Sequence, residues 1–599
     1  MKNKFYPKLF ERGYVGNVEV KNRAVRMPMG TELGNPDGSP SWATLKAYAE
    51  AGDGGTGIVF MDNAGVTQFH HVGLSIASDP YIGPMSLLAK TIKQHGAVPG
   101  LQIVHPGRDA ARRGQTAGFE IIDIHAACGV LLSNFLSPRN NRRNDMYGGS
   151  LHNRARFLIE VIRNIKKKAP GVALSVRLSG IDFEPEGITI EETVEVAKMC
   201  EAAGADAINI TWGSHAEVIN AAGLLSKHGA NHVEAAQMIK DAVSIPTMLC
   251  GGIYSPEIGE ELLENGVTDF VGIGKPALAD PMWAKKAEEG HPEDIRPCIG
   301  CGVGCHDRGM LSGGVVQCAV NASLYKYDGP VYPQAEVSKK VIVVGAGPAG
   351  CEAAITAKKC GHEVTLYEKR SIGGVLKEAT VSDSKEDLGR LITYYETQLK
   401  KNGIDVVFEE ANVDTIVKGG YDVAILATGA KVRVPEVKGL DSKEAIYAMD
   451  FLDQGAKTDA QNIVVVGGGI VGAETALILA EEQGKNVTIT TRSPEFFVSG
   501  VMGIAYMTRL AMAGVKNCPK MQLIAIEDGK PVFVGPRGIE TMDVDQVIIS
   551  SGFIPTFNKL RDEIEAASDE IEVVGIGDCM APRMVMDAVH EGYIAGINI

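Results

Sequence analysis

Eight short apolar runs, each followed by a segment of helical character, divide about the first 290 residues into repeated units. The predicted strands are, in chain order, RAVRMPM, TGIVFMD, VPGLQIVH, FEIIDIH, VALSVRL, AINITW, IPTMLC and DFVGIG. The segments between them, such as NRARFLIEVIRNIKKK, place apolar residues at helical spacing. Eight strand–helix units of this size predict an α/β fold of the TIM (β/α)8 barrel type, with the working side chains at the C-terminal ends of the strands.

Those strand ends carry glycines and polar side chains in a pattern that indicates a ligand site. From the first strand to the eighth they supply Pro28, Met29, Gly30 and Thr31; Gln102, His105 and Arg108; His125 and Cys128; Arg177; Trp212 and His215; Gly251 and Gly252; Gly274 and Lys275. The last two pairs lie where such barrels often bind a phosphate on backbone N–H groups. Each residue alone is more often structural, but together they favour a site.

The third crossover is unusually short. Only about 14 residues, PGRDAARRGQTAGF, separate His105 from the fourth predicted strand near Phe119. A parallel crossover with its helix needs about that many at minimum. We therefore expect either a truncated helix or a segment that is absent from this sequence.

A glycine motif opens the second half of the chain. In KKVIVVGAGPAGCEAAITAKKCGHEVTLYEKR, Gly345, Gly347 and Gly350 form GxGxxG between a predicted strand and a helix, and Glu368 ends the next strand. The glycines allow a pyrophosphate to approach the helix N-terminus, and the acid accepts a ribose hydroxyl. This context predicts a dinucleotide site.

The motif recurs in QNIVVVGGGIVGAETALILAEEQGKNVTITTRS with Gly467, Gly469 and Gly472, so two dinucleotides are expected. Here the following strand ends in Thr491 and Arg492 instead of an acid. An acid would bind the 2′-hydroxyl of NADH and repel a 2′-phosphate, whereas a guanidinium can bind that phosphate. Arg492 therefore favours NADPH; the alternative is a solvated loop residue.

Four of the 11 cysteines lie within the 21 residues CIGCGVGCHDRGMLSGGVVQC, between the predicted barrel and the first glycine motif. Cys298, Cys301, Cys305 and Cys318 have the spacing C-x2-C-x3-C-x12-C. Structural zinc sites usually combine two C-x2-C pairs, and this segment has one. Three bunched thiols with a fourth nearby favour a 4Fe–4S cluster, each iron taking one thiolate; zinc and a metal-free segment are the alternatives.

Composition excludes several classes of partner. The net charge is −15 and no long basic stretch stands out, which argues against nucleic acid. The N-terminal MKNKFYPKLFERGY lacks the apolar core of a secretory signal, and the most apolar run is interrupted by glycines and glutamates, so no membrane span is expected. We expect a cytoplasmic homo-oligomer whose cysteines are not a disulfide scaffold.

The barrel, the segment RPCIGCGVGCHDR and the C-terminal module together resemble the 2,4-dienoyl-CoA reductase and trimethylamine dehydrogenase group of the Old Yellow Enzyme family. The resemblance covers nearly the whole chain, and FLSPRNNRRNDMYGGSLHNRARF is a highly specific signature. The last 260 or so residues resemble glutathione-reductase-like flavoproteins, a pattern that ILATGA and VVGIGDC complete. The implied domains are an FMN barrel (1–290), a 4Fe–4S segment (291–335), a Rossmann-like FAD domain in two parts (336–455 and 561–599) and a Rossmann-like NAD(P)H domain (456–560).

The resemblance also implies roles for residues. The FMN ring would be contacted by Pro28, Met29, Gly30, Thr31, Gln102 and Arg177, and its phosphate by Gly252, Gly274 and Lys275. Lys275 replaces the arginine usual in the family, which leaves an ammonium without the bidentate fork. Asp578 would contact the sugar chain of FAD.

The motif after the fourth strand departs from the family. DIHAACGV gives His125, Cys128 and Val130, where the family usually has a second histidine and then a tyrosine, so the proton-donating tyrosine of dienoyl-CoA reductases is missing. His215, in INITWGSH, matches that enzyme's active-site histidine. We expect His125 to polarise a substrate carbonyl, His215 to supply a proton and Cys128 to belong to the same catalytic group. The short third crossover, which is longer in the family and helps cover substrate, implies a missing lid.

The resemblance implies an NAD(P)H-dependent enzyme acting on CH–CH bonds, with electrons passing from NADPH to FAD, to the cluster, to FMN and to an alkene conjugated to a carbonyl. The N-terminal run resembles isoflavone reductases of gut bacteria, so the expected small-molecule enone is the isoflavone daidzein, reduced to dihydrodaidzein. Alternatives are a 2,4-dienoyl-CoA reductase, a steroid or bile-acid enone reductase, an amine dehydrogenase, and an electron-transfer flavoprotein subunit that serves a partner protein.

Overall fold

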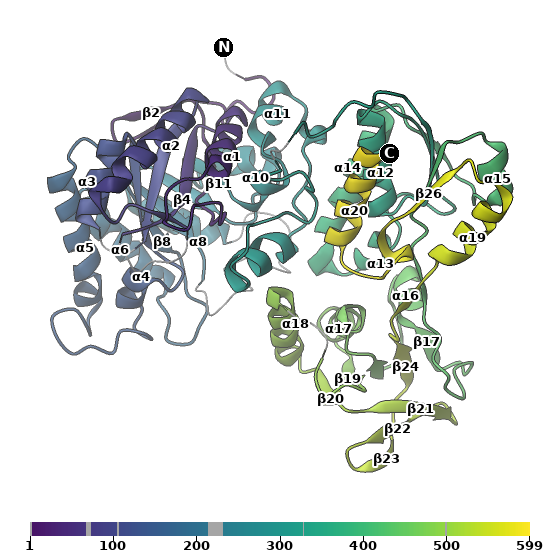
Figure 1. Cartoon of the computed structure of the whole chain (residues 1–599). Coiled ribbons are helices and arrows are strands. Elements are labelled where there is room, and N and C mark those ends of the chain that lie inside the picture. The colour runs from purple at the N-terminus through teal and green to yellow at the C-terminus, as the bar shows by residue number, and fades with distance from the viewer. Residues whose placement is uncertain (1–2, 67–72, 105–106, 214–231, 327–328, 497–499) are drawn as a thin grey trace. The chain divides into compact units, whose positions relative to one another are not determined.

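The computed structural model describes residues 3–66, 73–104, 107–213, 232–326, 329–496 and 500–599. The chain divides into two compact units, Met1–Asp328 and Gly329–Ile599 (Figure 1). Within the described ranges, no helix combines the length and the apolar character needed to cross a bilayer.

The first unit is a closed barrel of eight parallel strands, as the eight apolar runs predict. The strands are β3 (Ala24–Arg26), β4 (Ile58–Gly65), β6 (Val98–Val104), β7 (Ile121–Ala126), β8 (Ala173–Ser179), β9 (Ala207–Thr211), β10 (Thr247–Cys250) and β11 (Phe270–Ile273). Consecutive strands pair in parallel, and β11 pairs with β3 to close the ring. A short β5 (Leu74–Ser75) extends the β4 edge.

Helices cover the outside of the barrel (Figure 1). They are α1 (Trp42–Asp53), α2 (Ile82–Gln94), α3 (Arg108–Ala117), α4 (Leu131–Leu136), α5 (Leu151–Lys168), α6 (Ile190–Ala203), α8 (Val233–Ala242), α9 (Pro256–Glu264), α10 (Lys275–Ala279) and α11 (Trp283–Glu289). In α5, the Ser150 side chain accepts a hydrogen bond from the Asn153 N–H and so caps the helix. Its buried residues recur at helical spacing and pack on the outer faces of the strands.

The short third crossover holds α3, a helix of ten residues. It ends at Gly118, whose φ of 97° is the left-handed C-cap that glycine adopts without strain. A Cβ on Gly114 would lie 2.6 Å from Leu101, so the helix packs closely on β6. The crossover therefore accommodates a helix of ten residues. Neither the truncated helix nor the missing lid is tested by this observation, so both stay predictions, and His105 lies outside the described residues.

The barrel interior is apolar at the N-terminal ends of its strands and polar toward their C-terminal ends. The hairpin β1 (Gly13–Val15) and β2 (Val18–Val20) packs its valines against lumen residues such as Val25, Ile58 and Phe270. Because Val20 also approaches Gly57 at the start of β4, the hairpin covers the N-terminal ends of the strands. The C-terminal ends are left for a site.

The second unit contains two parallel sheets of Rossmann-like order, as predicted. The first is β14-β13-β12-β15-β26, built from β12 (Lys340–Val344), β13 (Glu363–Tyr367), β14 (Asp405–Val407), β15 (Val423–Leu426) and β26 (Glu572–Gly575). Its helices are α12 (Pro348–Lys359), α13 (Leu376–Ala379), α14 (Asp387–Lys401), α15 (Val413–Lys418), α19 (Phe557–Ala567) and α20 (Val585–Asn598). Helices α12 and α20 lie side by side (Figure 1), since a Cβ on Gly592 would be only 2.3 Å from the Ala349 carbonyl oxygen.

The second sheet has the order β17-β24-β18-β19-β20. Its strands are β17 (Ala445–Tyr447), β18 (Asn462–Val466), β19 (Asn486–Thr491), β20 (Lys516–Pro519) and β24 (Gln546–Ile549), and its helices are α16 (Ala448–Asp453), α17 (Ile470–Leu477) and α18 (Gly500–Met512). Two antiparallel sheets complete the unit: β16 (Ala430–Val432) with β25 (Phe553–Pro555), and β21 (Gln522–Glu527), β22 (Lys530–Gly535) and β23 (Gly538–Thr541).

Candidate active site and cofactor sites

The residues predicted to contact a flavin ring lie together at the C-terminal end of the barrel. His125 on β7 pairs in register with Arg177 on β8, and Gln102 on β6 pairs with Asp123, one step below His125 on the same face of β7. Thr31, after β3, is 1% exposed, while Pro28 and Met29 are half-buried. Gly30 is exposed.

A buried acid orients the glutamine. The Gln102 Nε2 atom donates to the Asp123 Oδ2 atom at 2.6 Å, and Asn209 Nδ2 donates to the same oxygen at 3.2 Å. Because the Gln102 amide gives an N–H to Asp123, its carbonyl oxygen is directed away from that carboxylate. Burial raises the pKa of Asp123, which is fully enclosed in the barrel.

Arg177 lies above this buried acid. Its Nη2 atom donates to the Thr211 hydroxyl at 3.2 Å and to the Cys250 sulfur at 3.6 Å. Its buried Nε–H has no hydrogen-bond partner within the described part of the chain. A guanidinium at the mouth of a barrel with an N–H group that lacks a protein partner can donate to a heterocycle rich in acceptors, such as the pyrimidine ring of a flavin.

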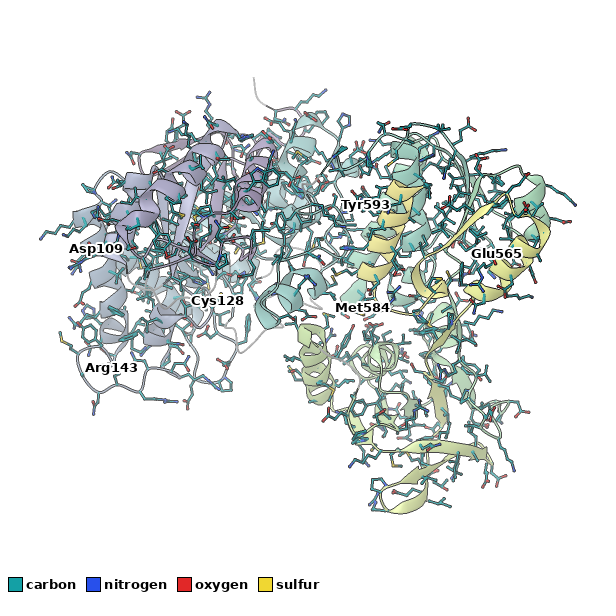
Figure 2. The ribbon with its side chains drawn as sticks, in the orientation of Figure 1. Asp109, Cys128, Arg143, Glu565, Met584 and Tyr593 are labelled. Carbon is teal, nitrogen blue, oxygen red and sulfur yellow. The ribbon has the colours of Figure 1, made fainter. Side chains whose placement is uncertain are left out.

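The β7 end holds His125 and Cys128. The backbone N–H of Ala127 donates to His125 Nδ1 at 3.3 Å, so the ring carries its proton on Nε2 when it is neutral. Cys128, labelled in Figure 2, has a φ of 57°, and its N–H donates to the Ser179 hydroxyl at 3.1 Å. Burial raises the pKa of the Cys128 thiol, partly offset by the Arg177 guanidinium. At neutral pH the thiol is therefore protonated.

The predicted phosphate loops follow β10 and β11. Gly251 and Gly252 have φ values of 119° and 74°, which side chains rarely adopt, and Gly274 precedes α10. Burial alone would lower the pKa of Lys275, but Tyr254 and the nearby cysteines raise it above its ordinary value. A charged ammonium beside glycine loops is the donor set that a phosphate needs.

Of the residues expected in the catalytic group, the structure places His125 and Cys128 but not His215. His215 lies outside the described residues, between Gly213 and His232. Val130, which replaces the family tyrosine, precedes α4 at its N-cap position.

The four-cysteine segment is part of the barrel unit. Cys305 and Cys318 pack with Met29, Leu278 and Val316 in one apolar cluster. Gly304 lies so close to the second half of the segment that a Cβ there would be 2.5 Å from the Gln317 carbonyl oxygen. The cysteines therefore lie next to the strand end predicted to contact FMN.

The thiols face a common volume. Burial raises the pKa of Cys301 to about 11 and that of Cys305 to about 12, and neighbouring cysteines add to both increases. Burial also raises the pKa of the Cys318 thiol well above its ordinary value, with contributions from Cys298, Cys301 and Cys305. Buried thiols that oppose one another's ionisation need a cation to become thiolates.

Four buried thiols grouped in this way could hold either a zinc ion or an iron–sulfur cluster. Tetrahedral zinc with Zn–S bonds of about 2.3 Å would hold its sulfur ligands about 3.8 Å apart. A cluster in which each cysteine binds a different iron requires wider separations.

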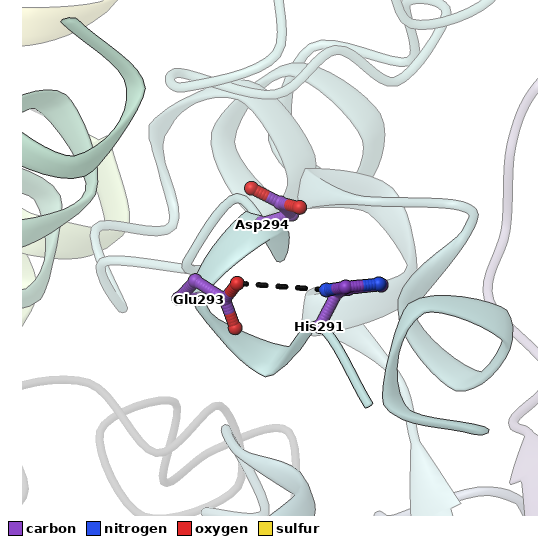
Figure 3. Close-up of side chains that lie close together, drawn as sticks. All are labelled: His291, Glu293 and Asp294. Carbon is purple, nitrogen blue, oxygen red and sulfur yellow. Dashed lines mark ion pairs between the residues drawn. The ribbon is translucent and has the colours of Figure 1, made fainter. Parts of the chain in front are cut away.

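Among the residues that the structure describes, one group of possible metal ligands has its atoms within 4.8 Å of one another: His291, Glu293 and Asp294 (Figure 3). His291 and Glu293 are exposed and form an ion pair of 3.6 Å. Exposed acidic side chains are hydrated by water without a metal, so the ion pair between His291 and Glu293 is enough to explain why these side chains lie together.

The first glycine motif forms an open cradle at the start of α12. Gly345 has a φ of 104°, and a Cβ on Gly350 would lie 1.8 Å from the Gly345 carbonyl oxygen. A Cβ on Gly347, by contrast, would meet nothing within 4 Å. Glu368 accepts hydrogen bonds from the backbone N–H groups of Ala346 and Arg370, at 2.8 and 2.7 Å. The cradle fits a dinucleotide pyrophosphate.

Asp578 lies in the turn after β26. Its Oδ1 atom accepts a hydrogen bond from the Arg583 N–H at 3.0 Å, and burial raises its pKa. The preceding Gly577 approaches Ala349 of α12, within 2.9 Å of where a Cβ would stand. The turn therefore adjoins the glycine cradle, where the prediction puts FAD.

The two cradle glycines give a matched pair of variants. Gly350→Ala forces the backbone of the motif apart, so we expect a loss of stability of about 1–3 kcal/mol and loss of bound FAD. Gly347→Ala leaves the fold intact and obstructs only the ligand, so FAD binding weakens while the FAD-free protein keeps its unfolding midpoint. FAD occupancy and thermal unfolding distinguish the two; equal destabilisation by both would contradict this geometry.

The second motif repeats the first in detail. A Cβ on Gly472 would lie 1.9 Å from the Gly467 carbonyl oxygen, whereas Gly469 is open. Gly467 itself has a φ of 129°. Arg492 follows β19 as an exposed residue, after the buried Thr491. The guanidinium can therefore reach a ligand from solvent.

Arg492 is expected to select NADPH. Because the side chain is exposed, we expect Arg492→Ala to raise the KM for NADPH by roughly 3–10-fold and to leave that for NADH within twofold. Arg537→Ala, at an exposed arginine of the same domain, is the control. Steady-state kinetics with both coenzymes measure the ratio. A wild-type preference for NADH would show that Arg492 is not the selector.

Known proteins match both units of the chain. Residues 108–294 match the NADH:flavin oxidoreductase / NADH oxidase family, and residues 339–580 match the pyridine nucleotide-disulphide oxidoreductase family. The chain is 33% identical over 654 residues to an NADH oxidase of Thermoanaerobacter brockii, which covers 98% of this chain and 99% of that protein. The chain belongs to the NADH:flavin oxidoreductase / NADH oxidase family. The resemblance to the Old Yellow Enzyme group is thereby confirmed.

Two further matches cover the whole of this flavin oxidoreductase. It is 31% identical to a cinnamate reductase of Clostridium sporogenes over 99% of both chains. The solved structure of a 2-naphthoyl-CoA reductase superposes with a TM-score of 0.91 at 29% identity and covers 99% of this chain and 100% of that one. The family supports FMN in the barrel unit and FAD with a pyridine nucleotide in the second unit.

Two acids of the site were not predicted from the sequence, Asp123 and Asp62. Both lie at the centre or end of an apolar strand run, FEIIDIH and TGIVFMD. A carboxylate inside an otherwise apolar strand is the signal that could have found them, because such a group is buried only with partners.

Proposed function

We propose that this flavin oxidoreductase reduces a C=C bond conjugated to a carbonyl, using NAD(P)H. The observation that carries the proposal is His125. Its Nδ1 atom accepts the Ala127 N–H, so the neutral ring carries its proton on Nε2, at the barrel end that carries Arg177 and Cys128. Such a donor can stabilise the charge that develops on a carbonyl oxygen when the conjugated alkene is reduced.

FMN, when bound, supplies the hydride for the β-carbon of the alkene. The residues that would hold its ring are Pro28, Met29, Gly30, Thr31, Gln102 and Arg177, and those for its phosphate are Gly252, Gly274 and Lys275. His125 orients the substrate carbonyl. The proton for the other carbon is assigned to His215 from the sequence match, and the protonated Cys128 thiol stands at the same strand end.

Cys298, Cys301, Cys305 and Cys318 would hold a 4Fe–4S cluster, a one-electron carrier. The packing of Cys305 and Cys318 against Met29 supports this assignment, because it brings the cysteines to the FMN side of the barrel. The glycine cradles at Gly345 and Gly467 would hold FAD and NADPH.

The proposed substrate is an isoflavone, daidzein, reduced to dihydrodaidzein. Val130 in place of a tyrosine leaves room for a flat polyphenol, and an isoflavone has its alkene in conjugation with a ring ketone. The relatives named as reductases of cinnamate and 2-naphthoyl-CoA support reduction of aromatic conjugated substrates. We also propose a cytoplasmic homo-oligomer.

An anaerobic screen that follows NADPH loss tests the proposal. The purified holoprotein should oxidise NADPH with daidzein and leave it unchanged with dihydrodaidzein. Cinnamate, 2-naphthoyl-CoA and a steroid enone test the other ene-reductase alternatives. An amine donates electrons and consumes no NADPH, so dimethylamine is tested separately, by whether it reduces the oxidised flavin. Turnover only with an amine, or only with a protein acceptor, would overturn the ene-reductase assignment.

A further inference from the structure

Thr31, at the predicted flavin contact after β3, is fixed from two sides. Its backbone N–H and its hydroxyl both donate to the Asp62 Oδ2 atom, at 2.8 and 2.6 Å. Its carbonyl oxygen accepts the N–H of Val316 at 3.1 Å, two residues before Cys318. Through these hydrogen bonds Thr31 links the C-terminal end of β3 to Asp62 on β4 and to the cysteine segment.

Asp62 is itself held by Tyr48 of α1. The Tyr48 hydroxyl donates to Asp62 Oδ1 and accepts the Asp62 backbone N–H at 2.7 Å. Tyr48 is 0% exposed and Asp62 2%. The Arg26 guanidinium lies 4.7 Å from the centre of the Tyr48 ring, which places a positive charge beside the buried acid. The carboxylate is thus locked in one orientation.

This arrangement decides what Thr31 can offer a ligand. A hydroxyl has one hydrogen and two lone pairs. Because the hydrogen of Thr31 is given to Asp62, only lone pairs remain for a group bound at the barrel mouth. Thr31 is therefore an acceptor there, although a threonine free of Asp62 could donate.

We propose that Asp62 is a positioning residue for the flavin: by accepting a hydrogen bond from the Thr31 hydroxyl, it fixes Thr31 as a hydrogen-bond acceptor toward FMN and so sets the redox balance of FMN. The inference rests on the placement of FMN in the proposed function. It does not depend on which substrate is reduced.

Asp62→Ala tests the idea, and Asp62→Asn is its matched control. Alanine accepts no hydrogen bond, so the Thr31 hydroxyl becomes able to donate to the flavin, which gains electron density on reduction. The oxygen of asparagine can still accept from the Thr31 N–H and hydroxyl while its NH2 group donates to the Tyr48 hydroxyl, so Asp62→Asn should leave the FMN balance within about twofold. In Asp62→Ala we expect the ratio of reduced to oxidised FMN at a fixed potential to rise by about 3–10-fold, the worth of one hydrogen bond. The FAD couple of the same holoprotein should stay unchanged.

A double-mutant cycle separates this role from a general effect of charge or packing. In a Thr31→Val background, at least half of the Asp62→Ala shift should vanish, and in Thr31→Ser it should persist. If Asp62→Ala does not fold, Thr31→Val alone, which removes the hydroxyl, should still change the ratio of reduced to oxidised FMN while the FAD couple stays unchanged. An equal shift in both backgrounds, or none in either, would overturn the proposal. Purified protein that contains no FMN would instead refute the proposed function. If FMN is present but no alkene is reduced, the substrate assignment fails, and the FMN shift can still be measured.

Discussion

Replacing Cys301 with alanine is expected to abolish turnover with NADPH, to below about 1% of the wild-type rate, while NADPH still reduces FAD. The loss is this large because each iron of a 4Fe–4S cluster takes one thiolate, and the barrel would lose its source of electrons. Stopped-flow spectra that resolve FAD from FMN reduction, with iron and sulfide analysis, make the measurement.

The control is Cys518→Ala, since Cys518 is also half-buried but lies in the second unit. This variant should keep its iron and its activity. The cluster assignment fails if Cys301→Ala retains full turnover, or if the wild-type protein contains zinc and no iron.

His125→Ala is expected to lower kcat by about 10²–10³-fold, the usual effect of removing one donor to a developing oxyanion. The reduction of FMN by NADPH should stay within twofold, because His125 acts on the substrate. The rate of FMN reoxidation by substrate, observed after mixing with the reduced protein, is the relevant measurement.

His152→Ala, at an exposed histidine of α5, provides the matched control and should have no effect. His125→Asn keeps an N–H donor and should recover part of the lost rate. If His125→Ala lowers kcat by less than about threefold, His125 contributes only to packing.

The barrel and both Rossmann-like sheets could be predicted because their strands are parallel. Such strands are buried on both faces and read as continuous apolar runs, as in IIDIHA and KVIVV. The sheet β21–β22–β23 was not predicted, although Asp528 and Gly529, with φ values of 51° and 76°, form the Asp-Gly turn typical of a hairpin. Its strands alternate polar and apolar residues over short lengths and give a weaker signal.

The candidate site was predictable where chemistry depends on residue type and spacing. The cysteine segment and the glycine motifs are of this kind, because Gly350 and Gly472 have no space for a side chain. The roles of Asp62 and Asp123 could not be predicted in this way. Their partners, Tyr48 and Gln102, come from other elements, so the hydrogen bonds exist only after the barrel closes.

The central claim, that the barrel reduces a conjugated alkene, is tested most directly by a single turnover without NADPH. Holoprotein reduced chemically under anaerobic conditions is mixed with daidzein, flavin reoxidation is followed, and the product is quantified by mass spectrometry. We predict one dihydrodaidzein for every two electrons that the reduced cofactors lose. Flavin that stays reduced with daidzein and with every other conjugated alkene, while an amine reduces the oxidised protein, would contradict the account.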